Sequence, residues 1–312
     1  RHIFFKKIKC RPWIFGKWSK KMKILIIGMD SFTGSYLKTA FESRDHIVFG
    51  TTSIAQHANA NCLFADFKYP ETIASVLYFF APDVIVNLAA LSFVAENQVA
   101  PFYAVNVSGT AALFENVRRI LPNIHVIIQP SSANIYGEQE GILDEKTHPY
   151  PVNHYAKSKW AMEVMLQGFD DLPIVITRPF NYTGAGQSER FLIAKMVEHF
   201  KKKSPVIELG NLDVARDFTD VRDVARAYVG LAENVQSGIF NIASGRSLSL
   251  KRIFDELQRQ SHHTMEIQVN PQLVRQNEIK NLIGNADKLT QAIGQWRKIP
   301  NFAETLSWML SE

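Results

Sequence analysis

The chain has 312 residues, of which 46% are hydrophobic and 21% charged, which suits one or two globular domains with a buried core. Its net charge of +5 comes from residues 1–21, which hold eight Lys and Arg; the remaining residues include 27 basic and 30 acidic ones, a net charge of −3. This balance argues against a nucleic-acid partner, and no apolar run is long enough to cross a membrane.

The basic segment 1–21 ends immediately before Met22 and lacks the apolar core of a signal peptide. We interpret it as upstream or vector-derived sequence outside the fold, with a membrane-surface anchor as the alternative. We therefore expect a cytoplasmic protein. The two cysteines, Cys10 and Cys62, do not have the spacing of metal ligands, so we expect neither a metal site nor a disulfide framework.

Apolar runs alternate with segments of helical period through the first 180 residues. The predicted strands are 23–27, 46–50, 83–87, 124–129 and 172–177. The predicted helices are 32–43, 105–120 and 154–167. Repeated strand–helix–strand units predict a parallel sheet covered by helices on both faces, with ligands at the carboxyl ends of its strands.

Beyond residue 180 the alternation loosens into a glycine-rich loop at 183–187, a helix at 191–203 and a short strand at 206–209. We expect residues 22–180 to form a Rossmann-type, doubly wound α/β domain to which later segments return. Residues 181–312 are predicted to form mainly a smaller α/β substrate-binding region, with the active site in the cleft between the two.

The first strand leads into Gly28-Met-Asp-Ser-Phe-Thr-Gly34, which has the spacing of a glycine-rich turn before a helix. Small residues there let backbone amides approach a pyrophosphate at the helix N-terminus. Ser31 replaces the middle glycine of the fingerprint, so a plain strand-to-helix turn is the alternative. We predict cofactor contacts at Gly28, Ser31, Phe32 and Gly34.

The residues after the second strand bear on the choice of cofactor. An acidic residue there would bind the ribose 2′-hydroxyl of NAD, but this chain has Thr51, Thr52 and Ser53. These hydroxyls favour NADP(H), with NAD(H) as the alternative. Asp66 follows a short apolar run and could accept a hydrogen bond from adenine, and residues 87–90 end the next strand beside the cofactor.

The segments Ser131-Ser-Ala-Asn-Ile-Tyr-Gly137 and Tyr155-Ala-Lys-Ser-Lys159 supply a hydroxyl, a phenol and an ammonium. A Tyr and a Lys four residues apart share a helix face. The phenol can protonate a bound carbonyl, and the ammonium is expected to lower the phenol pKa. This pattern predicts a nicotinamide-dependent oxidoreductase with Ser132, Tyr155 and Lys159 as catalytic residues, although the spacing alone also fits an exposed helix pair.

These motifs, with Arg178-Pro-Phe-Asn181, resemble in order and spacing the extended short-chain dehydrogenase/reductases that act on nucleotide sugars, the NAD-dependent epimerase/dehydratase family. The resemblance runs from about residue 23 to the end of the chain. Segments 178–187 and 210–223 look most similar to the branch of GDP-6-deoxy-D-mannose reductases and GDP-mannose 4,6-dehydratases. The resemblance to the family implies cofactor contacts at Thr51, Asp66, Phe67, Leu88, Ala89, Ala90, Asn106, Tyr155, Lys159 and Pro179.

The resemblance also implies a GDP-linked sugar as substrate, with contacts at Ser92, Asn134, Asn181, Arg216, Arg275 and Glu278. Arg216 would bind the pyrophosphate, because a guanidinium matches phosphate oxygens well; a surface ion pair with Asp217 or Asp220 is the alternative. A homodimer through helices 105–120 and 154–167 is implied too, although burial against their own sheet would equally explain the apolar faces of these helices.

Dehydratases of this branch need a carboxylate base just after the catalytic hydroxyl, where this chain has Ala133 and Asn134. The residues therefore favour reduction of a 4-keto-6-deoxy sugar to a GDP-6-deoxyhexose over dehydration. A 4-epimerase that retains NAD is the nearest alternative. A cofactor-binding regulatory protein with decayed catalysis is a second, because Ser31 and Asn134 depart from the family pattern.

Overall fold

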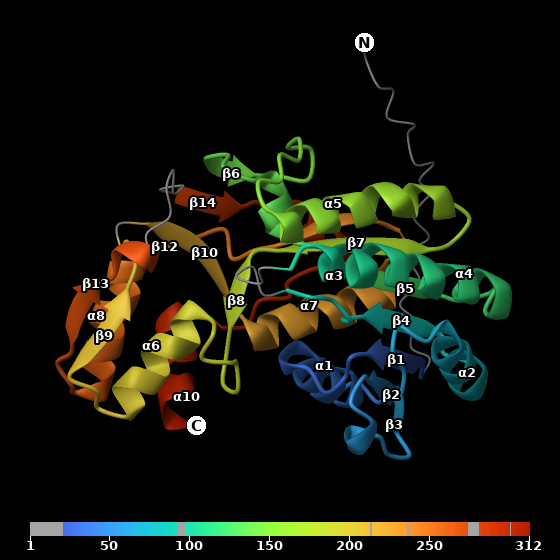
Figure 1. Ribbon diagram of the computed structural model, residues 1–312, viewed down its shortest axis with the longest axis horizontal. Coiled ribbons are helices and arrows are strands. Elements are labelled where there is room, and N and C mark those ends of the chain that lie inside the picture. Colours follow the sequence, from blue (N-terminus) through green and yellow to red (C-terminus); the bar gives the residue numbers. More distant parts are fainter. Residues whose placement is uncertain (1–20, 93–97, 213, 236, 274–280, 300) are drawn as a thin grey trace, which may run out of the picture.

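The computed structural model describes residues 21–92, 98–212, 214–235, 237–273, 281–299 and 301–312. Its central sheet consists of β1 (Lys23–Ile27), β2 (Ile47–Thr52), β3 (Cys62–Phe64), β4 (Val84–Asn87), β5 (Val126–Pro130), β7 (Ile174–Pro179) and β11 (Gly238–Ile242). All neighbouring strands are parallel, in the order β11-β7-β5-β4-β1-β2-β3 (Figure 1). This arrangement confirms the predicted Rossmann-type sheet. The strand order reverses between β1 and β4, where such sheets bind dinucleotides.

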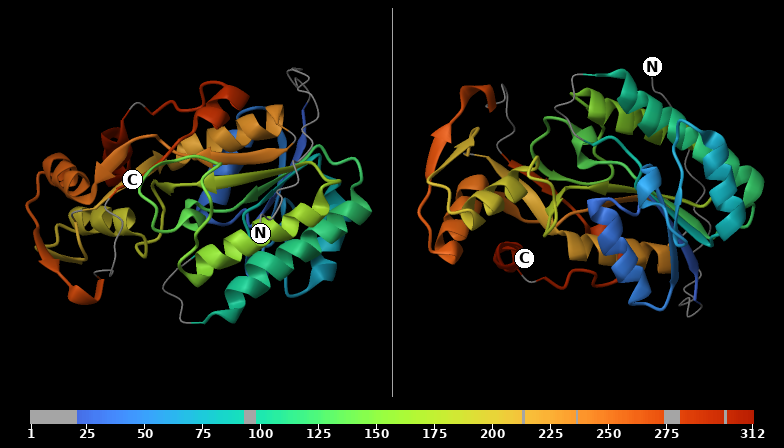
Figure 2. Two further views of the ribbon diagram at one scale, coloured as in Figure 1. Left: turned by 90° about the horizontal axis from the view of Figure 1, so that it is seen from above. Right: turned by 60° about the horizontal axis from the view of Figure 1, so that its bottom comes forward.

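Helices cover both faces of this sheet (Figure 2). One layer contains α1 (Phe32–Glu42), α7 (Val221–Asn234) and α9 (Asp287–Ile293), and the other contains α2 (Pro70–Phe80), α4 (Thr110–Ile120) and α5 (His154–Leu166). On β1, Ile24 and Ile26 pack toward the first layer, whereas Leu25 and Ile27 pack toward the second. Burial on both faces explains why this strand is apolar at successive positions.

The helix that leads into α4 is longer than predicted. It starts as α3 (Ala100–Tyr103) and passes through a π-helical turn, η2 (Ala104–Gly109), into α4. A Cβ at Gly109 would lie 2.4 Å from the Phe67 ring, so the close packing of this turn on Phe67 requires glycine. Phe114 and Val117 of α4 are fully buried within this single chain, which accounts for the apolar face noted in the sequence.

The smaller region contains a mixed sheet in the order β12-β10-β14-β6, with β8 paired to β10. Its strands are β6 (Gly141–Leu143), β8 (Asn181–Thr183), β10 (Ala215–Asp220), β12 (Ser247–Ser249) and β14 (Asn281–Gly284). A separate pair joins β9 (Val206–Leu209) to β13 (Glu266–Val269), and α6 (Leu192–Lys201), α8 (Leu250–Ser261) and α10 (Phe302–Ser311) share an apolar core with them. The remaining short helices are η1 (Ala55–His57), η3 (Ala133–Tyr136), η4 (Gln167–Phe169) and η5 (Pro271–Leu273).

The two regions exchange segments along the chain. β6 lies between β5 and β7 in the sequence but joins the smaller sheet, whereas α7 and β11 come after residue 181 and pack with the central sheet. Within the described ranges, no helix is both long enough and apolar enough to cross a bilayer.

Candidate active site

Ser132, Tyr155 and Lys159 lie at the carboxyl edge of the central sheet. Ser132 follows β5, and Tyr155 and Lys159 are one turn apart on α5. They are 5%, 8% and 3% exposed, so all three are buried. The Lys159 ammonium donates a hydrogen bond of 2.9 Å to the carbonyl of Pro130, the last residue of β5, and the Tyr155 phenol lies close enough to Ser132 for that hydroxyl to affect its pKa. The structure thus brings the three predicted catalytic residues together.

The start of α5 is fixed by its own sequence. The Asn153 side chain accepts a hydrogen bond of 2.8 Å from the Ala156 amide and so caps the helix. This cap makes His154 the first helical residue and puts Tyr155 and Lys159 on the buried side of the first two turns. The local sequence therefore sets the direction in which both side chains point.

Burial dominates the protonation of both groups. It raises the pKa of Tyr155 to about 12, and the hydrogen bond with Ser132 opposes this rise. It lowers the pKa of Lys159 to about 8, against the attraction of the Glu163 carboxylate. The net shift of the phenol pKa is therefore upward, opposite to the lowering expected from the ammonium alone. Tyr155 is a protonated donor at neutral pH, and Lys159 loses its charge only above about pH 8.

The glycine-rich turn fits a dinucleotide pyrophosphate. Gly28 has φ of +80° and donates a hydrogen bond of 3.1 Å to the Thr51 hydroxyl, and a Cβ at Gly34 would lie 2.5 Å from the Met29 carbonyl oxygen. Ser31, in place of the middle glycine, accepts a hydrogen bond of 3.2 Å from the Gly34 amide and caps α1. The result is a close turn that opens onto a helix N-terminus, which is where these folds bind phosphate.

The strand ends beside this turn also fit a cofactor. Leu88, Ala89 and Ala90 follow β4, and a Cβ at Gly28 would lie 3.5 Å from the Ala89 nitrogen. At the end of β5, the Ser131 hydroxyl is buried without a hydrogen-bond partner among the described residues, so it could bond to a ligand. These features suit the nicotinamide cofactor expected from the sequence.

Other predicted cofactor residues bond mainly to the protein itself. The Asn106 side chain exchanges hydrogen bonds with the Leu91 backbone and donates to the Ser158 hydroxyl, so it joins the loop after β4 to α5. The carboxylate of Asp66 accepts a hydrogen bond from the Lys68 amide. Phe67 packs beneath η2, and Pro179 ends β7. Phe32 stacks on Tyr182 with ring centroids 6.4 Å apart.

Two predicted substrate residues lie on paired strands. Asn181 of β8 is exposed and donates a hydrogen bond of 3.4 Å to the Asp217 carbonyl of β10, the strand that carries Arg216. The Asp217 carboxylate accepts from the amides of Ser244, Gly245 and Gly284. The carboxylate of Asp220 bonds to Arg222 and Thr305. Both aspartates named as alternative partners of Arg216 are therefore engaged elsewhere.

Of the other predicted substrate residues, one lies beside the catalytic hydroxyl and one lies in an exposed loop. Asn134 donates hydrogen bonds to the Ser132 hydroxyl from its backbone amide and from Nδ2, at 3.1 and 3.0 Å. Ser92 is exposed in the loop after β4. Arg275 and Glu278 lie outside the described residues.

Polar contacts that the sequence did not predict join the glycine-rich turn to the smaller region. Thr33 and Tyr182 share a hydrogen bond of 2.9 Å between their hydroxyls. The Tyr36 hydroxyl donates to the Ala185 carbonyl at 2.7 Å. No local pattern marks these residues, because each pair is separated by 149 positions in the chain. They fix the helix of the cofactor turn against β8 and the loop that follows it.

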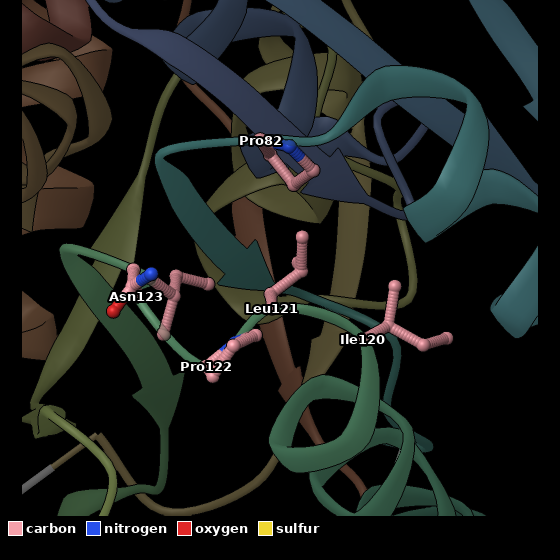
Figure 3. Close-up of a pocket in the computed structure, with 6 residues that line it drawn as sticks. Pro82, Ile120, Leu121, Pro122 and Asn123 are labelled. Carbon is pink, nitrogen blue, oxygen red and sulfur yellow. The ribbon is translucent and has the colours of Figure 1, made fainter.

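A surface hollow lined by Pro82 and residues 120–124 lies elsewhere (Figure 3). These residues precede β4 and β5, so the hollow is at the amino ends of the strands. Ser132 and Lys159 lie at the opposite edge. Its lining has no titratable side chain, and we assign it no part in catalysis.

Comparison with known proteins agrees with this geometry. The profile of the NAD dependent epimerase/dehydratase family matches residues 24–243. GDP-6-deoxy-D-talose 4-dehydrogenase of Aggregatibacter actinomycetemcomitans is 39% identical over 281 residues, 88% of this chain and 92% of that protein. GDP-6-deoxy-D-mannose reductase of Pseudomonas aeruginosa is 26% identical over 305 residues, 93% of this chain and 96% of that protein.

A solved structure from Burkholderia cenocepacia J2315, described as a candidate epimerase, has a TM-score of 0.87 and 38% identity to this chain. The match covers 95% of this chain and 98% of that one, so the likeness includes both the central sheet and the smaller region. The chain therefore belongs to the NAD dependent epimerase/dehydratase family and is an NAD(P)-dependent oxidoreductase of the extended short-chain dehydrogenase/reductase type.

Proposed function

We propose that the protein reduces the 4-keto group of GDP-4-keto-6-deoxy-D-mannose to give a GDP-6-deoxyhexose. The observation that carries this proposal is the buried group of Ser132, Tyr155 and Lys159 with an amide, Asn134, in place of a carboxylate beside the hydroxyl. Such a site can move a hydride and a proton but has no base for dehydration at that position. The relatives named as a GDP-6-deoxy-D-talose 4-dehydrogenase and a GDP-6-deoxy-D-mannose reductase support the same substrate class.

Each catalytic residue has a defined part in this reduction. Bound nicotinamide cofactor supplies the hydride that the C4 carbon accepts. Tyr155 donates its phenolic proton to the C4 oxygen, and Ser132 donates a hydrogen bond to that oxygen as negative charge develops on it. The Lys159 ammonium stabilises the phenolate left on Tyr155, which then regains a proton from solvent.

The assay supplies GDP-4-keto-6-deoxymannose, made in situ by a separate dehydratase, and follows the loss of reduced nicotinamide absorbance with NADH and with NADPH. Stoichiometric consumption with a GDP-6-deoxyhexose product supports the proposal. Product analysis must also distinguish the two C4 epimers, of which the 6-deoxytalose form is favoured by the 39% identical relative. No consumption with any reduced cofactor contradicts the proposal, and NAD retained through purification would then indicate a 4-epimerase.

Tyr155→Phe tests whether the assigned site performs the reaction. The variant should lose turnover and keep its affinity for cofactor, because the hydroxyl is the only group removed. Unchanged turnover would exclude Tyr155 as the proton donor. A wild-type protein that binds cofactor but turns over neither GDP-linked nor UDP-linked sugars would favour a regulatory role.

A homodimer through α4 and α5 stays a prediction. Val164 on α5 is 46% exposed and is available to such an interface, whereas the main apolar residues of α4 are already buried. Light scattering of the purified protein would give the mass that decides between monomer and dimer.

A further inference from the structure

The carboxylate of Asp30 extends from the glycine-rich turn to the carboxyl end of β2. Its Oδ2 atom accepts a hydrogen bond of 2.6 Å from the hydroxyl of Thr52, the last residue of β2, and lies 3.1 Å from Nδ1 of His57. The Thr52 hydroxyl in turn accepts a hydrogen bond of 3.0 Å from the Ile54 amide. Three segments, the turn, β2 and η1, therefore hold one carboxylate in place.

The backbone that carries Asp30 is also fixed. The Met29 amide donates a hydrogen bond of 2.9 Å to the Thr51 carbonyl. A Cβ at Gly50 would lie 2.4 Å from the Met29 Cβ, so the Met29 side chain packs directly on β2 where glycine leaves room. The carboxylate is thus positioned before any ligand binds, and its side chain is 30% exposed to accept one.

The end of β2 is where a Rossmann fold places the adenosine ribose. A carboxylate there accepts hydrogen bonds from ribose hydroxyls, and its charge repels a 2′-phosphate. The sequence has no acidic residue at the end of β2 itself, and the hydroxyl side chains found there instead are the basis for expecting NADP(H). In the structure two of the three hydroxyls have protein partners, because Thr51 accepts from the Gly28 amide and Thr52 donates to Asp30.

We propose that Asp30 is a specificity-determining residue that selects NAD(H) over NADP(H). It supplies from the glycine-rich turn the carboxylate that other dinucleotide-binding folds supply from the second strand. Within the described ranges the basic side chain in contact with Asp30 is that of His57, and no Lys or Arg is paired with it to attract a 2′-phosphate. The proposal holds for either reaction direction and for any sugar substrate.

The test is calorimetric titration of the protein, freed of copurified cofactor, with NAD⁺ and with NADP⁺ at one ionic strength. We expect wild type to bind NAD⁺ at least about tenfold more tightly than NADP⁺. Asp30→Asn keeps the size of the side chain and removes its charge, so the ratio of the two dissociation constants should fall about tenfold. Thr52→Val, which removes the hydroxyl that holds Asp30, should lower the ratio by a smaller factor.

Asp45→Asn is the matched control. It removes the same charge from the turn before the amino end of β2, where Asp45 has φ of +62°, a conformation that Asn tolerates. This variant should keep the wild-type ratio. The proposal is overturned if wild type binds NADP⁺ as tightly as NAD⁺, or if Asp30→Asn unfolds at the wild-type temperature and keeps the wild-type ratio. Because the readout is binding alone, it does not depend on whether the proposed sugar is reduced.

Discussion

Glu163, on the catalytic helix α5, and Arg178, on β7, form a buried ion pair. Two hydrogen bonds, of 2.7 and 3.1 Å, join the carboxylate to the guanidinium, and the side chains are 2% and 3% exposed. Arg178 also donates to the Tyr136 hydroxyl at 3.0 Å, which donates to Asn241 at 2.7 Å. This network joins α5 to β7, η3 and β11. Glu163 is one turn beyond Lys159, so the same carboxylate also affects the catalytic ammonium.

Replacing only one member of this pair should be strongly destabilising. Glu163→Leu leaves the Arg178 charge buried without its main partner, at a cost of about 3–5 kcal/mol in the free energy of unfolding. The double variant Glu163→Leu/Arg178→Met removes both charges and should recover much of that loss. Urea unfolding of the two variants and wild type measures the difference. A single variant as stable as wild type would show that the pair does not have this role.

The reduction should lose rate as pH rises through about 8. Burial lowers the pKa of Lys159 to about 8, so the ammonium that stabilises the phenolate is deprotonated above that pH. Tyr155, with a pKa raised to about 12, stays protonated across the same range. Glu163→Gln removes the negative charge that raises the pKa of Lys159. The loss of rate should therefore begin at a lower pH in this variant. The measurement is kcat/KM against pH, and a flat profile up to pH 10 would contradict the assignment.

The buried ammonium of Lys159 should lower the free energy of unfolding of the wild-type protein at neutral pH. Burial lowers its pKa from 10.5 to about 8, so between these values the unfolded chain binds more protons and stability rises with pH. The full difference is on the order of 3 kcal/mol. Lys159→Met lacks this titration. Its stability relative to wild type should therefore decline between pH 7 and pH 10 in urea unfolding, whereas parallel pH dependences would refute the coupling.

The central sheet could be predicted because its signals are local. Strands buried on both faces are apolar at successive positions, so the bounds predicted for β1 are confirmed and those of β2, β5 and β7 are shifted by one or two residues. Helix α2 was not among the predicted elements, although Ile73, Val76, Leu77 and Phe80 recur at helical spacing and are buried. That pattern would have predicted it.

The parts that escaped prediction depend on distant partners. β10 contains Arg216, Asp217 and Asp220 and has no apolar run, and its buried Asp217 is satisfied by amides up to 67 residues away. The Tyr155 and Lys159 pair was predictable because both lie within two turns of one capped helix. The role of Asp30 could not be predicted from the sequence, because only the pairing of β1 with β2 brings it close to Thr52, 22 residues away.

Asn134 should orient the catalytic hydroxyl. The Ser132 oxygen accepts from both nitrogens of Asn134, so the Ser132 proton is left to point toward Tyr155 and the bound carbonyl. Asn134→Ala should lower kcat about tenfold with little change in cofactor affinity. Asn134→Asp should lower it further, because a carboxylate accepts the Ser132 proton and reverses the hydrogen bond. Steady-state kinetics with a parallel cofactor titration checks this, and an unchanged kcat in both variants would exclude the role.

Gly34 should be required for the shape of the cofactor turn. A Cβ there would lie 2.5 Å from the Met29 oxygen and 2.7 Å from the Gly28 oxygen, so Gly34→Ala must displace backbone that approaches the pyrophosphate. We expect affinity for NAD⁺ to fall by at least about tenfold, together with the unfolding temperature. Gly168→Ala is the control, since a Cβ at Gly168 meets no atom within 4 Å, and it should leave NAD⁺ affinity and stability at or above wild-type values. If both variants bind NAD⁺ as tightly as wild type, the backbone of the turn can shift to accommodate the added Cβ without a loss of affinity. The close approach of α1 to the Met29 carbonyl would then not determine cofactor binding.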